Sequence, residues 1–186
     1  MSSGKRRARV SEPHVRPRAA TSTAPKARRP ADRVGQDATR QLSTAPVHLR
    51  AAEQALAAGE PEKARASVDR AIAEGVREAD IPRLALALAE TNRYLGRHKD
   101  SLDWIDRRLA QAPSPKTRAV LLRARITSLR GIDTQAILNQ ADEALAAAQA
   151  AHDMESYAAV LMAGSFAGYR KGDAPAAQKF ARLAAQ

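Results

Sequence analysis

From Pro46 onward, apolar residues recur at the three- and four-residue spacing that is typical of amphipathic helices. In residues 61–75, for example, Ala64, Val68 and Ala71 fall on one face of a helix. No segment alternates apolar and polar residues as a half-buried strand does. The pattern predicts helices near residues 46–58, 61–75, 81–95, 98–111, 115–130, 134–150, 154–170 and 174–185.

Several of these helices follow a residue whose short side chain is suited to capping a helix, because its oxygen accepts a hydrogen bond from a free backbone N–H. The candidate caps are Asp80, Ser114, Asp133, Asp153 and Asp173. Proline stands within two residues of the first, second and last of them, in the first helical turn, where its missing N–H costs nothing.

Four glycines each end one predicted helix and precede another, where a positive φ suits glycine. They are Gly59, Gly96, Gly131 and Gly172, separated by 37, 35 and 41 residues. Small residues recur where the paired helices are expected to cross: Ala52, Ala64, Ala89, Ser101, Ala124, Ala136, Ser165 and Ala177. The register slips by about one residue in the third unit, which a one-residue insertion near Gln135 explains. Helix–turn–helix units at this period predict a helical solenoid.

In these features, residues 46–186 resemble tetratricopeptide-repeat (TPR) proteins. The resemblance covers four helical hairpins, at about 46–77, 81–113, 115–150 and 154–186, and lies in the second half of the motif, including Pro113 where that motif closes. In the first half of the second unit, Ala85, Leu88-Ala89 and Asn92 replace the usual Trp, Leu-Gly and Tyr. The resemblance implies an all-α fold, a right-handed α-solenoid, and a protein–protein interaction module. The variable unit length is similar to that of bacterial regulatory proteins.

The composition agrees with closely packed helices. Apolar residues make up 44% of the 186 residues, much of this alanine, and aromatic residues only 3%. The chain has no cysteine, which excludes a disulfide framework and a thiolate metal site and suits a reducing, cytoplasmic location. No stretch approaches the roughly 18 consecutive apolar residues of a membrane span, so we expect none.

Residues 1–45 differ from the rest of the chain. They hold 11 of the 31 Lys and Arg but only 3 of the 20 Asp and Glu, and they contain no aromatic residue. Such a segment buries too little apolar surface to offset its ordering entropy, so we expect a disordered basic arm. One interpretation is a flexible, solubilising tail. The other is a nucleic-acid contact, made mainly to phosphates, through Lys5, Arg6, Arg7, Arg9, Arg28 and Arg29.

We find no catalytic or metal-binding constellation in the sequence. His14, His48, His98 and His152 lie far apart and no two form an i,i+4 pair. We therefore expect a protein without enzymatic activity, metal or cofactor. Trp104 borders the apolar face of its helix, which favours packing against the next hairpin over service as an exposed anchor for a partner.

The TPR resemblance also implies which residues face the inner groove. Its groove-facing spacing selects Arg83, Arg93, Tyr94, Arg118, Arg125, Phe166 and Tyr169 as partner-binding residues, together with Glu53 and Glu90. Four arginines and three aromatics suit an acidic or C-terminal peptide, whereas the alternative is a solvated face of mixed charge. The leading prediction is a protein–protein adaptor, and the alternative is a nucleic-acid-associated protein.

The last predicted helix is apolar on more than one side, through Ala177, Phe180, Ala181, Leu183 and Ala184. Solenoids normally end in a helix with a polar outer face. We therefore expect this helix to be covered by a second copy of the chain or by a partner helix, unless the chain is part of a longer repeat array.

Overall fold

The computed structural model describes residues 44–185, and these form helices joined by short turns, without strands. The helices are α1 (Ala45–Ala57), α2 (Pro61–Ala73), the 3₁₀ helix η2 (Glu78–Asp80), α3 (Ile81–Leu95), α4 (His98–Leu109), α5 (Pro115–Leu129), α6 (Thr134–Ala150), α7 (Met154–Lys171) and α8 (Ala174–Ala184). The prediction of an all-α fold is confirmed, and each predicted helix ends within two residues of its expected bounds. Residues 1–43 of the predicted basic arm, with its six candidate anion-binding residues, lie outside the described residues, and Ala45, the last residue of that arm, is the first residue of α1.

Side-chain caps begin four of the helices, as the sequence predicts. Ser114, Asp133, Asp153 and Asp173 each accept a hydrogen bond from the backbone N–H three residues ahead. The prediction for Asp80 is wrong. This residue precedes α3, but its carboxylate accepts a hydrogen bond from Nε of Arg77 at 2.9 Å and does not cap the helix.

The four helix-ending glycines lie in turns and all adopt positive φ, as expected. The angles are 73° at Gly59, 69° at Gly96, 91° at Gly131 and 73° at Gly172. A Cβ added at Gly96 would meet no atom within 4 Å, so the conformation of the backbone, and not space, favours glycine there.

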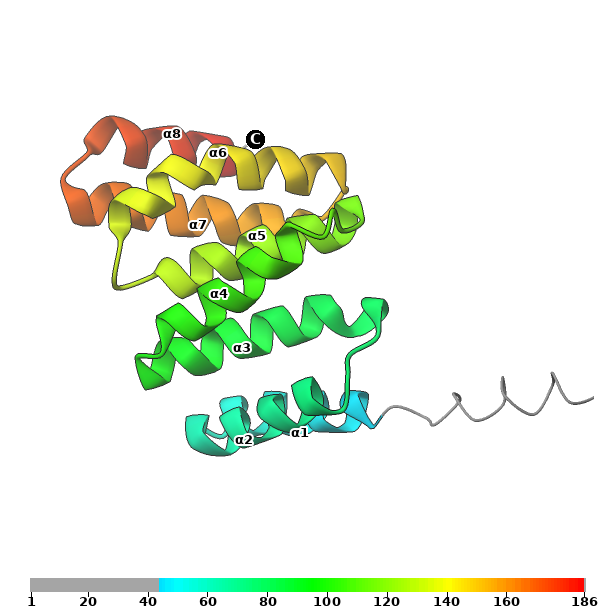
Figure 1. Ribbon diagram of the computed structural model, residues 1–186. Helices are drawn as coiled ribbons and strands as arrows, with labels where there is room; N and C mark the ends of the chain where they lie inside the picture. The colour runs from blue at the N-terminus through cyan, green and yellow to red at the C-terminus, as the bar shows by residue number, and fades with distance from the viewer. Residues whose placement is uncertain (1–43, 186) are drawn as a thin grey trace, which may run out of the picture. The chain divides into compact units, whose positions relative to one another are not determined.

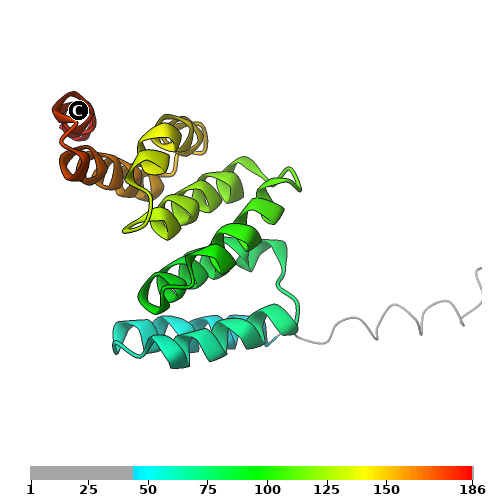
Figure 2. The same ribbon diagram turned by 60° about the vertical axis from the view of Figure 1, so that its left-hand side comes forward.

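The helices pack as consecutive hairpins, which follow one another from α1–α2 to α7–α8 (Figures 1 and 2). The first helix of each later hairpin packs on both helices of the hairpin before it: α3 contacts α1 and α2, α5 contacts α3 and α4, and α7 contacts α5 and α6. Two buried clusters result: one includes Leu49, Leu88 and Ile105, the other Val160 and Phe180. Helix α5 contributes side chains to both clusters, so it joins the two halves of the hairpin stack.

Most of the small residues predicted at the helix crossings are buried. Ala52, Ala64, Ala89, Ser101 and Ala124 are fully buried, as predicted. Ala136 is only partly buried, and its neighbour Ile137 is buried instead, which agrees with the one-residue slip expected in the third unit.

The last hairpin departs from the expectation, because Ala177 of α8 faces Gly168 and not Ser165. A Cβ added at Gly168 would lie 2.5 Å from the backbone nitrogen of Ala177. One turn earlier, a Cβ at Gly164 would lie 2.8 Å from the ring of Phe180. The backbones of α7 and α8 therefore approach at two glycines, where any larger residue would push the helices apart.

Trp104 packs inside the stack. Its side chain belongs to the first buried cluster, and the guanidinium of Arg108 lies 5.3 Å from the centre of its ring. The interpretation of Trp104 as a packing residue is confirmed.

The close approach of α7 and α8 at Gly168 can be tested by substitution. Gly168→Ala should lower the free energy of unfolding by about 2 kcal/mol, because the added methyl collides with backbone that cannot move aside. The measurement is urea denaturation followed by circular dichroism. In a helix without the collision, the same change would raise stability, since alanine is the better helix former. An unchanged or more stable variant would therefore contradict the close approach.

Candidate functional site

The described structure has a groove between α3, α5 and α7, with a volume of about 410 Å³. We call it the central groove. It is lined by Glu90 of α3, by Arg123, Ile126, Thr127 and Arg130 from α5 and its C-cap, and by Ala159, Val160, Met162, Ala163 and Phe166 of α7. Its position follows from the hairpin stack, because the first helices of successive hairpins lie next to one another and their outward faces form one surface.

The central groove contains one arginine without a partner among residues 44–185. Arg123 is paired with Glu155 at 2.8 Å, and Glu90 is paired with Arg93, also at 2.8 Å. The exposed side chain of Arg130 forms no hydrogen bond or ion pair within that range. The paired charges cancel, so the groove has a net positive charge that favours an anionic group.

The α7 wall of the groove exposes large apolar side chains. Met162 is 72% exposed and Phe166 is 53% exposed, although side chains of this kind are usually buried. The guanidinium of Arg170 lies 5.9 Å from the ring of Phe166 and adds a second cation beside the groove. The wall thus combines apolar surface with positive charge.

Smaller hollows continue along the same surface. Arg83 and Leu86 line one of about 250 Å³ against α1, and another of about 400 Å³ that reaches the start of α7. Glu90 belongs to the first of these as well as to the central groove, and Arg123 belongs to the second as well as to the groove. The hollows are therefore connected through shared side chains.

Of the predicted partner-binding residues, Arg83 and Phe166 line the central groove or its smaller hollows, as do Glu53 and Glu90. Two of the predicted arginines are already neutralised. Arg83 donates two hydrogen bonds to Glu53, at 3.0 and 2.7 Å, which raise its pKa. Arg93 lies over the ring of Tyr94 at 4.2 Å. Burial lowers the pKa of Arg93, but its hydrogen bond and ion pair with Glu90 outweigh burial and raise it. Phe166 lines the central groove and also a hollow between α7 and α8, which Tyr169 lines as well.

Arg118 and Arg125 do not join the other predicted residues. Arg125 donates to Asp106 of α4 at 2.7 Å and to Gln140 of α6, and Arg118 pairs with Glu143 of α6. Both side chains therefore point toward the second helices of the hairpins, away from the central groove. Contrary to the prediction, neither Arg118 nor Arg125 lines the central groove.

The sequence pattern did not predict where Arg118 and Arg125 point, because α5 has no single apolar face. It is buried on most sides, through Thr117, Ala119, Val120, Leu121, Leu122, Ala124, Ile126, Thr127, Ser128 and Leu129. A helix buried on most sides gives periodicity little to orient it by. Arg123, Arg130 and Met162 line the central groove but were not among the predicted partner-binding residues. The only available signal was that Lys116, Arg123 and Arg130 are spaced seven apart and so share a helix face.

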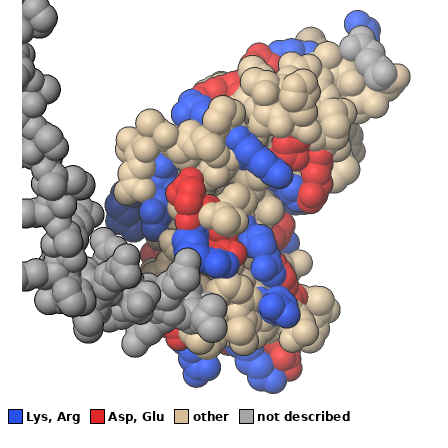
Figure 3. Space-filling view, turned by 90° about the vertical axis from the view of Figure 1, so that its right-hand side faces the viewer, with Lys and Arg blue, Asp and Glu red and all other residues tan. Residues whose placement is uncertain are grey.

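Other polar groups in the described structure serve its own packing. His48 contacts Glu74 at 3.0 Å, and His98 contacts the carbonyl oxygen of Ser128 at 2.7 Å. Among the described residues, no group of three or more His, Asp or Glu is placed to hold a metal ion. Figure 3 shows Lys and Arg interspersed with Asp and Glu over the lower and middle part of the surface, and mostly uncharged side chains at its upper end.

Helix α7, which carries the apolar wall, is positioned by the cap at Asp153. Its carboxylate accepts from the backbone N–H of Ser156 at 3.0 Å and from the Ser156 hydroxyl at 2.7 Å. Burial raises the pKa of Asp153, but these hydrogen bonds, assisted by the charge of Arg123, outweigh burial and leave the pKa below its ordinary value.

Comparison with known proteins gives no relative from which to transfer a function: no protein-family model, curated protein or solved structure matches the chain. Within residues 44–185, none of the helices has the length and apolar character needed to cross a membrane.

The contribution of the Asp153 cap to stability should depend on pH. Because the folded-state pKa is lowered, the cap stabilises the protein above the unfolded pKa near 3.8 and loses that contribution as the pH falls through the folded value. Asp153→Ala should cost about 1 kcal/mol at pH 7, and the difference from wild type should vanish in acid. Asp153→Asn is the matched control: it keeps the acceptor without the titration, so its cost at pH 7 should be smaller. The role of the carboxylate would be contradicted if both variants lost the same free energy of unfolding at pH 7 and if this loss relative to wild type stayed the same in acid.

Proposed function

We propose that residues 46–186 form an α-solenoid of the TPR-like kind and act as a non-enzymatic protein–protein adaptor. The central groove binds a segment of a partner protein that carries a carboxylate beside an apolar side chain. The carboxylate pairs with Arg130, and the apolar side chain packs on Met162 and Phe166.

The packing order of the helices supports the solenoid. In such architectures each repeat contacts only its neighbours, and stacked hairpins bury a continuous core. Here the hairpins contact one another in that order, with α3 between α1 and α5, and α5 between α3 and α7. The helix-ending glycines, spaced 37, 35 and 41 residues apart, are consistent with one hairpin per repeat.

The observation that carries the proposed binding function is the unpaired Arg130 in a groove whose other charges are paired among the described residues. An arginine binds a carboxylate through two parallel hydrogen bonds, which gives direction as well as charge. Met162 and Phe166 supply adjacent apolar area of the kind that anchors protein–protein contacts. A peptide with both features satisfies the groove better than a purely apolar or basic one.

A second candidate function is suggested by the charge of residues 1–45, which hold 11 of the 31 Lys and Arg. In that case the segment contacts nucleic-acid phosphates, and affinity falls steeply with added salt. Deleting residues 1–45 separates the two candidates: the adaptor keeps its peptide ligand, whereas the nucleic-acid binder loses most of its salt-sensitive affinity.

The experiment for the adaptor is selection of 12-residue peptides from a random displayed library against the full chain. The selected peptides should carry Asp or Glu next to an aliphatic or aromatic residue. Arg130→Glu should weaken their binding by about tenfold or more, measured by fluorescence anisotropy, because it places like charges together.

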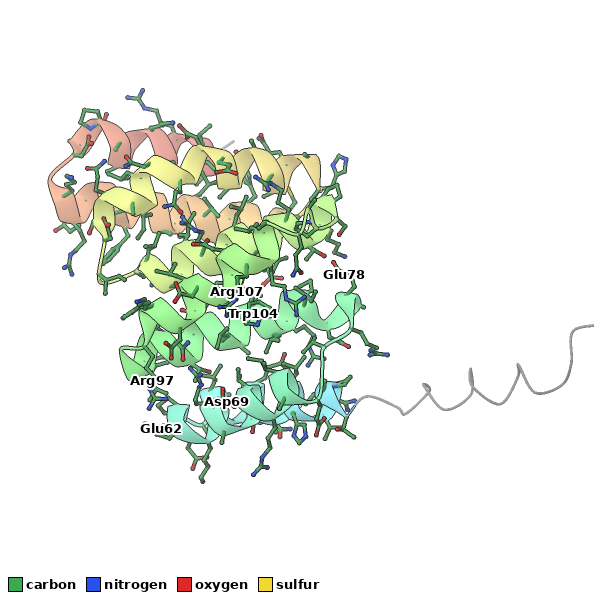
Figure 4. The ribbon with its side chains drawn as sticks, viewed as in Figure 1. Glu62, Asp69, Glu78, Arg97, Trp104 and Arg107 are labelled. Atoms are coloured by element: carbon green, nitrogen blue, oxygen red, sulfur yellow. The ribbon has the colours of Figure 1, made fainter. Side chains whose placement is uncertain are left out.

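The matched control is Arg107→Glu, which makes the same charge change at an exposed position on α4 (Figure 4). It should leave affinity within about twofold of wild type, since a distant exposed charge is screened. Selected peptides without an acidic residue, or equal losses in the two variants, would refute recognition by Arg130.

A further inference from the structure

A second, larger hollow lies between α7 and α8, outside the part of the stack that other hairpins cover. Its volume is about 610 Å³. Met162, Phe166 and Tyr169 form its α7 side, and Phe180, Ala181 and Ala184 contribute from α8. Among residues 44–185, no charged residue lines it. We call it the terminal hollow.

The terminal hollow exposes an unusual amount of apolar surface. Tyr169 is 78% exposed and Met162 is 72% exposed, and both lie beside the uncharged surface of α8. Contiguous apolar surface with charge only at its edges is typical of an interaction site, because it is costly to keep in contact with water.

The rest of the stack indicates the shape of the occupant. The α3–α4 hairpin is covered by α5, and the α5–α6 hairpin is covered by α7, so each uses this side to receive a helix. The lining residues on α7 run from Leu161 to Tyr169, which corresponds to about 12 Å of helix. That length accommodates roughly two turns of a helix laid along the hollow.

The rim indicates the charge of the occupant. Arg182 contacts Gln178, a lining residue, at 3.4 Å, and Arg170 lies beside the ring of Phe166. Neither arginine is paired with a carboxylate among residues 44–185. The nearby Lys179 is neutralised by Asp142 at 2.6 Å. The apolar hollow is therefore flanked by unpaired positive charge.

We propose that the terminal hollow docks an amphipathic helix of a partner protein whose apolar face is flanked by carboxylates. The apolar side chains enter the hollow, and the carboxylates pair with Arg170 and Arg182. A second copy of this chain fits less well, because two identical faces would bring these arginines together and no carboxylate of the described part of the chain lines the hollow to offset them. This site shares Met162 and Phe166 with the central groove but does not include Arg130. The substitutions that disrupt it in the test therefore lie outside the central groove, and the test does not depend on the function proposed for that groove.

The test uses two synthetic 16-residue helical peptides as probes. They share one apolar face, built from leucine, and differ only in the flanking positions, which are all Glu in one and all Lys in the other. With the full chain, the Glu-flanked helix should bind at least about tenfold more tightly than the Lys-flanked helix in fluorescence anisotropy.

Three variants locate the site. Ala181→Glu places a charge in the hollow at an exposed position and should abolish binding of the Glu-flanked helix. Arg170→Glu with Arg182→Glu should reverse the preference, so that the Lys-flanked helix binds more tightly. Arg130→Glu should leave both affinities unchanged, which separates this site from the central groove.

The proposal is supported if the chain prefers the Glu-flanked helix, if Ala181→Glu removes this binding, and if Arg170→Glu with Arg182→Glu inverts the preference. Equal binding of the two helices, binding of neither, or binding unaffected by Ala181→Glu overturns it. Sedimentation equilibrium gives one more overturning result: a dimer of the chain that Ala181→Glu dissociates would make a second copy the occupant.

Discussion

Close approach of helices at very small side chains is the constraint on which this structure depends. Alanine fills little space, so helices whose inner faces are built from it bury apolar surface only when their backbones come near one another. Ala52, Ala89 and Ala124 are fully buried at such contacts, and in the last hairpin the requirement becomes strict enough to need Gly164 and Gly168. Each thin hairpin packs on the first helix of the next hairpin, and this stacking creates the central groove.

Helix α5 links the fold to the candidate site. It supplies side chains to both buried clusters, and its remaining face carries the polar side of the central groove. Because packing fixes α5 on most sides, the rotation of this one helix decides which arginines reach the groove and which point toward α4 and α6. A helix with a single buried face would leave more of this choice to its sequence pattern.

Pairing among charges, more than their number, decides what this surface offers a partner. Glu53 and Glu90 neutralise Arg83 and Arg93, and exposed pairs of this kind add little to stability. Their main effect is to remove two cations from the set that an acidic ligand can use. Near Met162, Phe166 and Tyr169, the arginines without a carboxylate partner among residues 44–185 include Arg130, Arg170 and Arg182, at two places along the stack.

The sequence by itself determined the helices and their ends, because amphipathic spacing, caps and helix-ending glycines act within a few residues of one another. Eight helices and four of five caps follow from such local signals. Only the tertiary structure decided that α7 and α8 meet at Gly168 and that Arg123, not Arg118 or Arg125, lines the groove. It also decided which arginines are neutralised, since Glu53 lies 30 residues from Arg83 and reaches it only because α1 packs on α3. These features depend on how one helix is rotated against another, which apolar periodicity does not fix when a helix is buried on most sides.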